Sequence, residues 1–225
     1  MSDTFTPWSP SPEAVAGGRG ARVVYRNAPL RSEVPPEHRG ATRTQLPITP
    51  GLRVLRAHIV GRFPFIRQTY MPGRSRPMLD TQRLDMHQAG RAIDFMVAQL
   101  GRQPDHAHGD QIANYLAANA ERFGVQFIVW AGYKFNAGAR TPAERFAPYT
   151  GTVPHLDHPH VEITPEAGAM ALPWYRTQQS PAATPSDDAP APYEDAGGPS
   201  PLVMGGVALV SLAAAFAGVW LIRRR

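Results

Sequence analysis

The amino-acid sequence predicts an α+β fold, in which helices flank a small, mostly antiparallel sheet, and a transmembrane helix near the C-terminal end. Helix-like and strand-like patterns follow one another without regular βαβ repetition, which favours helices packed on one antiparallel sheet. An uninterrupted apolar run late in the chain predicts the membrane helix. We expect five segments: a disordered Arg/Pro-rich extension (1–46), a folded domain (47–176), a Pro/Ala-rich linker (177–201), the transmembrane helix (202–222) and a basic tail (223–225).

The folded domain is expected to begin with a helix at Thr49-Pro50, because proline suits the first helical position. The apolar residues that follow recur on one helical face: Leu52, Leu55, Ile59 and Phe63. Residues 66–70 are then a predicted strand and residues 72–83 a loop. A second helix is predicted from Asp110 to Phe123 and stops at Gly124. Residues 125–130 follow as a buried strand.

Two further strands are predicted to carry polar side chains on one face. In residues 91–97 the alternation places Asp94 away from the apolar face, which consists of Ile93, Phe95 and Val97. In residues 156–163 it places His158 and His160 on a common face, with their Cα atoms roughly 6.5 Å apart.

These residues suggest a zinc site split between two parts of the chain. His87 and Asp94 form a His-x(6)-Asp signature, and His155-Leu-Asp-His158-Pro-His160 lies some distance beyond. A catalytic zinc takes three N or O ligands and leaves one position open for water, so His87, Asp94 and one of the late histidines would complete it. Gly90 suits a turn or a close backbone approach between His87 and the strand of Asp94.

At these signatures the chain resembles the zinc peptidases that cut bacterial cell-wall peptides. That group contains lysostaphin, the D-alanyl-D-alanine carboxypeptidases and the sonic hedgehog zinc domain. The resemblance covers roughly residues 48–164 and implies zinc ligands at His87, Asp94 and His160, with His158 as the catalytic partner. It also implies a peptidase that hydrolyses peptidoglycan stem peptides as a carboxypeptidase or an endopeptidase.

Two positions depart from the pattern of that group. Asp85 stands where many members have Ser or Thr, which changes the hydrogen bonding expected near the metal. The carboxypeptidases often use a Glu-x-x-His signature, whereas this chain has His155-x-x-His158, so an imidazole would move the proton. Asp157 is expected to orient a neighbouring side chain. An arginine should bind a substrate carboxylate, and the candidates are Arg67, Arg74 and Arg83.

Several histidines have simpler explanations. His106 and His108 lie in a polar stretch that we predict to be a loop before the second helix, and His38 and His58 have no partner pattern. A competing hypothesis for the whole domain is a non-catalytic, zinc-stabilised module that binds cell-wall peptides or a protein. The retained His158 favours an enzyme, since a purely structural zinc needs no imidazole facing its open position.

The composition argues against several other kinds of site and partner. Cysteine is absent, so a disulfide framework and a thiolate metal site are excluded. Arginines crowd residues 19–43, but no aromatic residues are interleaved with them, and we expect no nucleic-acid partner. Lys134 is the single lysine of the chain.

The location of the domain is inferred from two conflicting signals. The apolar run of about 21 residues is followed by Arg223-Arg-Arg225, which predicts a cytoplasmic C-terminus and an extracytoplasmic zinc domain in a single-pass membrane protein. No apolar signal-peptide core is visible in the first thirty residues. We expect the outward topology, because the substrate of the resembling group lies outside the membrane.

Overall fold

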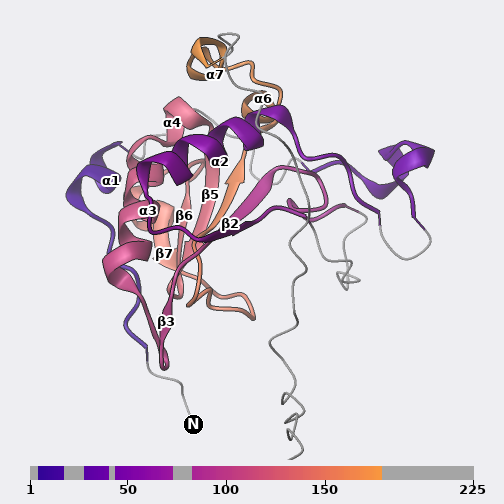
Figure 1. The fold of residues 1–225 in the computed structure, drawn as a ribbon. Helices are drawn as coiled ribbons and strands as arrows, with labels where there is room; N and C mark the ends of the chain where they lie inside the picture. Colours follow the sequence, from indigo (N-terminus) through magenta and orange to yellow (C-terminus); the bar gives the residue numbers. More distant parts are fainter. Residues whose placement is uncertain (1–4, 18–27, 41–43, 73–82, 179–225) are drawn as a thin grey trace, which may run out of the picture. The chain divides into compact units, whose positions relative to one another are not determined.

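The computed structural model describes residues 5–17, 28–40, 44–72 and 83–178, and its fold is α+β, as predicted (Figure 1). The helices are α1 (Pro12–Gly17), α2 (Pro50–Arg62), α3 (His106–Ala118), α4 (Ala120–Phe123), α5 (Pro142–Arg145), α6 (Pro165–Gly168) and α7 (Pro173–Thr177), with short 3-10 turns at Arg31–Glu33 and Pro36–His38. The strands are β1 (Gln68–Tyr70), β2 (Ala92–Met96), β3 (Gln99–Leu100), β4 (Gln103–Pro104), β5 (Val125–Trp130), β6 (Tyr133–Asn136), β7 (Phe146–Pro148) and β8 (His160–Ile163).

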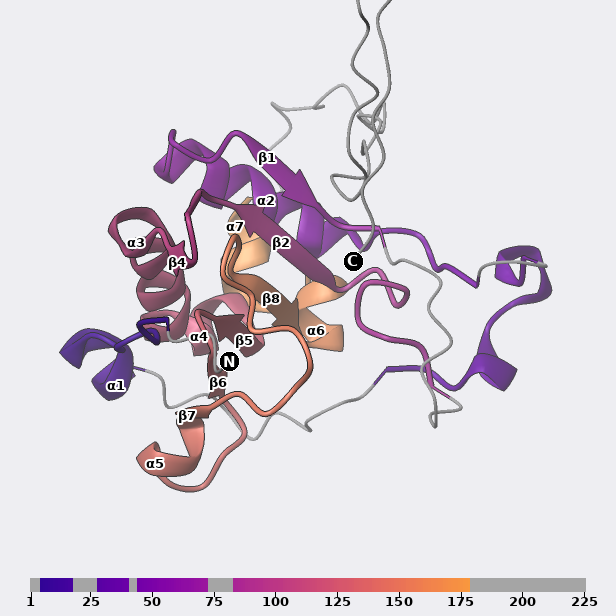
Figure 2. The same ribbon diagram turned by 90° about the horizontal axis from the view of Figure 1, so that it is seen from below.

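Six strands form one sheet in the order β1-β2-β8-β5-β6-β7, and every neighbouring pair in it is antiparallel. Figure 2 shows the strands in this spatial order across the sheet, with α3 on one side and the turn that precedes β2 on the other. Strands β3 and β4 form a separate hairpin. The last strand in the chain, β8, therefore lies in the middle of the sheet, between β2 and β5.

The main hydrophobic core lies between the sheet and the helices that cover one of its faces. One row of buried apolar residues crosses it through paired positions: Ile93, Val161, Ile128, Phe135 and Phe146. Helices α2 and α3 pack on this row with Leu52, Leu55, Ile59, Ile112 and Leu116, all fully buried. Because side chains alternate along a strand, residues one position away face the opposite side, and Asp94 and His160 are among them.

The start of α2 and the helix stop at Gly124 agree with the sequence. Pro50 is the first residue of α2 and Thr49 precedes it as the N-cap. Gly124 ends α4 in the left-handed region, with φ of 62°. The predicted strand at residues 66–70 is shorter, since Ile66 donates its amide to the Phe63 carbonyl in a turn and β1 begins at Gln68.

The second helix differs from the prediction at its start. It begins at His106 and is interrupted at Asn119, which has φ of −110° and donates its side-chain amide to the Tyr115 carbonyl. The prediction of a loop at His106 and His108 is therefore wrong, because both residues lie in the first turn of α3. Each imidazole bonds to a nearby aspartate, His106 to Asp110 one turn further along α3 and His108 to the N-cap residue Asp105.

The expectation of a disordered extension over residues 1–46 is wrong for the parts that the structure describes. Trp8 is 1% exposed, and its indole nitrogen donates to Asn114 of α3. Ala28 and Val34 are buried in a second, smaller cluster on the other side of the sheet, with Leu84, Met86, Ala89 and Ala92. A few apolar anchors hold these residues despite a composition rich in proline and arginine.

Part of the C-terminal prediction cannot be compared with the structure. In the described residues no helix has the length and apolar character that a membrane crossing requires. The predicted transmembrane segment 202–222, the basic tail and the linker from residue 179 lie outside the described residues.

Candidate metal centre

Strand pairing brings Asp94 and His160 together. Asp94 of β2 and His160 of β8 are direct partners in the antiparallel register, and their side chains share the face opposite the helices. Opposed residues of an antiparallel pair have Cβ atoms about 5 Å apart, so the two side chains can touch. The His160 Nδ1 atom lies 2.9 Å from Asp94 Oδ1.

His87 reaches the same point from a tight turn at residues 85–90. Asp85 caps this turn, because its Oδ1 atom accepts a hydrogen bond from the backbone N–H of Gln88, with an N-to-O distance of 2.6 Å. The backbone then reverses at Gly90, which has φ of 67° and lies so close to residue 47 that a Cβ atom would be 2.1 Å from the Pro47 carbonyl oxygen. Only glycine meets both conditions. Asp85 thus shapes the turn that carries His87, which explains an aspartate at this position.

The three side chains meet at a spacing that suits a metal ion. His87 Nε2 lies 3.2 Å from His160 Nδ1 and 3.3 Å from Asp94 Oδ1. Ligand atoms at the metal distances usual for histidine and carboxylate occupy tetrahedral corners about 3.3 Å apart. These three residues form a group that could hold a metal ion. The same atoms also pair with one another as a hydrogen-bonded ion-pair cluster.

Each imidazole is oriented by a partner on its other nitrogen. His87 Nδ1 lies 3.0 Å from the Met71 carbonyl, and His160 Nε2 lies 3.3 Å from Glu162 Oε1. Glu162 also accepts from Gln126 Nε2 at 3.1 Å. A metal-binding histidine usually donates its second N–H to a carbonyl or carboxylate, which fixes both the tautomer and the ring orientation. His87 and His160 both have this arrangement.

A β-bulge supplies Gln126. Strand β5 shifts its register against β8 between Val125 and Phe127, so Gln126 has no partner in the ladder. The extra residue turns the Gln126 side chain towards Glu162, and it is fully buried there. Bulges often re-aim a side chain in this way next to functional sites.

The electrostatics of the centre favour a positive charge within it. Burial raises the pKa of Asp94, but the His87 charge and the hydrogen bonds from His160 and His87 outweigh it and hold the pKa well below its usual range. Burial lowers the pKa of His160, yet hydrogen bonds to Asp94 and Glu162 raise it to about 10. The buried Asp94 and the largely buried Glu162 therefore stabilise a cation at this point, as a proton on His160 or as a metal ion.

His158 stands beside the three residues. It lies in the loop before β8, since β8 begins at His160 and not at residue 156 as predicted. Pro159 cannot continue the strand as a donor, but its carbonyl accepts the Phe95 amide and keeps the loop next to β2. His158 Nδ1 bonds to Asp157 Oδ1 at 2.7 Å, and its Nε2 lies 3.6 Å from Asp94 Oδ1. Asp157 thus orients a neighbour, as predicted, though from a loop.

His155 is a fourth imidazole at the centre, and it is the first residue of the His155-x-x-His158 signature. Its ring centre lies 5.0 Å from that of His158 and 5.5 Å from that of His160. Burial, together with the charges of His160 and His158, lowers the pKa of His155 to about 3, so this ring stays neutral. Its backbone has φ of 54°, and its carbonyl accepts the amide of Ala131, a second residue with positive φ. Such unusual backbone geometry is concentrated at functional sites.

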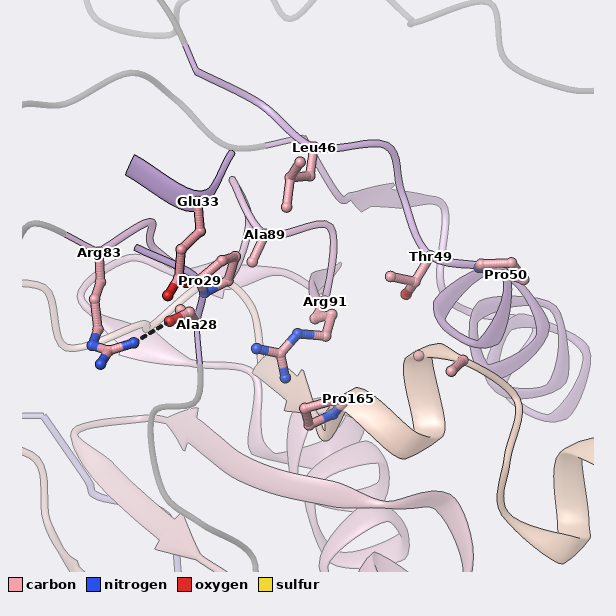
Figure 3. Close-up of a pocket in the computed structure, with 12 residues that line it drawn as sticks. Ala28, Pro29, Glu33, Leu46, Thr49, Pro50, Arg83, Ala89, Arg91 and Pro165 are labelled. Carbon is pink, nitrogen blue, oxygen red and sulfur yellow. Dashed lines mark hydrogen bonds between the residues drawn. The ribbon is translucent and has the colours of Figure 1, made fainter. Parts of the chain in front are cut away.

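The two predicted arginines that the structure describes, Arg67 and Arg83, do not lie at the centre. Arg74 lies outside the described residues, and Arg67 is exposed just before β1. Arg83 donates to the Ala28 carbonyl at 2.7 Å and lines a separate cavity of about 710 Å³, together with Glu33 and Arg91 (Figure 3). None of the residues that line this cavity belongs to the metal group or to the loop of His158.

Sequence reasoning missed Glu162 and Gln126 for different reasons. Glu162 is two residues after His160, so the strand alternation already placed both on one face, and that signal was available. Gln126 is one polar residue in an apolar run, and it reaches the centre only because of the bulge. A bulge depends on how two strands pair, which their separate sequences do not reveal.

We expect Glu162→Gln to weaken metal binding by about 10- to 100-fold, because the neutral amide polarises His160 less than the carboxylate does. Competition with a chromogenic chelator would measure the dissociation constant. Glu166→Gln is the matched control, since Glu166 is exposed on α6. If the wild type and the Glu162→Gln variant bind the metal with equal affinity, Glu162 does not support metal binding.

Comparison with known proteins gives the family. No curated protein and no solved structure matches the chain. The D-alanyl-D-alanine carboxypeptidase and lysostaphin resemblance therefore stays a prediction. A family model described as VldE, C-terminal domain, matches residues 44–160, which include α2, the His87 turn, β2 and the loop of His158. This match spans more than half of the sequence, and the chain belongs to the VldE C-terminal domain family.

Proposed function

We propose that the protein is a zinc metallopeptidase that hydrolyses peptide bonds of peptidoglycan stem peptides. The observation that carries the proposal is that a metal group and a separate imidazole lie side by side. A three-residue metal group, His87, Asp94 and His160, stands next to an imidazole, His158, that an aspartate orients towards it. A purely structural zinc site has four protein ligands, whereas a catalytic one has three and an open position.

The donor set favours zinc. Two imidazoles and one carboxylate are ligands that zinc accepts at tetrahedral spacing, and the chain has no cysteine to form a thiolate site. His158 lies outside the compact group, whose three ligand atoms are all within 4.8 Å of one another. This geometry supports His160 as the ligand and His158 as the neighbouring base.

The roles of the residues follow from their hydrogen bonds. Zinc in this group would polarise the scissile carbonyl and activate a water molecule for attack. Asp157 accepts the Nδ1 proton of His158, so the Nε2 atom of His158 can take up a proton on the side facing the centre. His158 would then accept the proton of the attacking water and return it to the leaving amine. Glu162 and Met71 hold the two metal-binding imidazoles in place.

Digestion of purified peptidoglycan by the full-length protein tests the proposal. We expect mass spectrometry to detect stem peptides cut at one type of bond, with cleavage lost after chelation and restored by zinc. Stoichiometric zinc with retention of peptidoglycan fragments but no cleavage would favour the alternative, a non-catalytic module that binds cell-wall peptides. Absence of zinc binding would reject both.

A further inference from the structure

One line of residues crosses the whole sheet on the face of the metal group. The register pairs them in this order, one per strand: Tyr70, Asp94, His160, Val129, Lys134 and Ala147. Paired residues point to the same side of a sheet. Lys134 of β6 therefore shares its face with Asp94 and His160.

The neighbours of Lys134 confirm its orientation. Phe135 is fully buried in the helix-side core, and Tyr133 packs against that core. Since successive side chains alternate, Lys134 between them faces the other way. It is separated from His160 by one strand only, so their Cα atoms are roughly 10 Å apart at the usual strand spacing. The four-carbon stem of lysine can shorten this gap.

The charge of Lys134 has no counterpart in the part of the chain that the structure describes. Lys134 is half-buried, and it makes no ion pair or hydrogen bond with any described side chain. It is also the single lysine in 225 residues. A half-buried lysine on the same sheet face as a candidate catalytic centre is suited to bind an anionic group of a ligand.

Arg67 and Arg83, the two predicted arginines that the structure describes, are less suited to this role. Arg67 is two residues from Thr69, whose hydroxyl accepts from Arg56 of α2, so alternation directs Arg67 to the helix side. Arg83 lines the separate cavity beyond the His87 turn. Lys134 is on the correct face and in the same row as the metal group.

We propose that Lys134 binds a carboxylate of the substrate and thereby selects the bond that is cut. This inference rests on the proposed peptidase function and names its substrate class, a peptide with a carboxylate close to the scissile bond. An extended chain advances about 3.4 Å per residue, and part of the 10 Å separation is spanned by the lysine itself, so the carboxylate lies roughly one or two residues beyond that bond. The carboxylate can be the chain end or an acidic side chain.

Calorimetric binding tests the proposal without relying on turnover. The full-length, zinc-loaded protein would carry His158→Ala to prevent cleavage. The probes are a short peptide ending in D-alanyl-D-alanine, its C-terminal carboxamide, and a carboxamide peptide with glutamate next to the last residue. We expect the free carboxylate to bind at least tenfold more tightly than the plain carboxamide. Lys134→Met, which keeps the alkyl stem, should remove this preference, and Lys134→Gln should do the same.

Two variants serve as controls in the same background. Lys134→Arg should keep most of the preference, and Arg140→Met should keep all of it, since Arg140 is exposed beyond the end of β6. Recovery of tight binding by the glutamate peptide would identify a side-chain carboxylate as the natural group. Equal binding of the first two probes, or no binding of either, would overturn the role of Lys134. So would a preference that survives Lys134→Met. Failure of the peptidase proposal is seen separately, as absence of cleavage products with native His158.

Discussion

Replacement of His160 by alanine is expected to abolish stoichiometric zinc binding. The change removes one of the three proposed ligands and leaves Asp94 and the largely buried Glu162 without the imidazole that both carboxylates contact. Breaking a buried pair by removing one partner costs about 3–5 kcal/mol, so we also expect a lower free energy of unfolding. Metal content would be measured by mass spectrometry on the purified protein, and stability by denaturant unfolding.

His87→Ala should show the same loss of zinc with a smaller loss of stability, because the second nitrogen of His87 contacts only a backbone carbonyl. His38→Ala is the matched control, since the His38 ring makes no contact with the metal group. In the wild type, added zinc should raise the thermal midpoint, and in the two ligand variants it should not. Full zinc occupancy in both variants would disprove the assignment of the metal group.

The His158→Ala variant should retain zinc but lose turnover by roughly two to four orders of magnitude. This is the usual contribution of a general acid–base group, and His158 is the imidazole beside the three ligands with its Nδ1 held by Asp157. Release of peptides from peptidoglycan and zinc content would be measured on the same sample. Asp157→Asn should have a smaller effect, because the amide still orients the ring but stabilises its protonated form less.

Two outcomes would change the assignment of His158. Loss of zinc together with activity would show that His158, and not His160, is the third ligand. Wild-type activity with full zinc would remove His158 from the mechanism and direct attention to His155, the other imidazole in the loop.

Short patterns predicted the parts of the fold that depend on local chemistry. Thr49-Pro50 started a helix, Gly124 ended one, and alternation in residues 91–97 placed Asp94 opposite the core. These predictions succeed because helix ends and strand faces are decided by neighbouring residues. The grouping of His87, Asp94 and His160 is implied by the two signatures together with the family resemblance, and the structure brings the three side chains to one point.

The predictions that failed depend on contacts between distant residues. Trp8 is buried only because Asn114 and the core beyond it are present, and composition alone gave no reason to expect this. The position of Lys134 in the same row as Asp94 and His160 depends on which strands are neighbours, and β8 enters the sheet between β2 and β5 although it is the last strand in the chain. Strand order is set by the packing of the whole domain, so no local pattern specifies it.

The direct pairing of Asp94 with His160 has a consequence for the quality of any preparation of this protein. A shift of β2 by one residue against β8 would turn Asp94 to the helix side, away from His160, and would turn Ile93 out of the core. Molecules with a misaligned β2 therefore lose part of the core as well as the metal group. If the centre binds one zinc ion, the amount of tightly held zinc per chain counts the correctly folded fraction of a sample, even before any substrate is known.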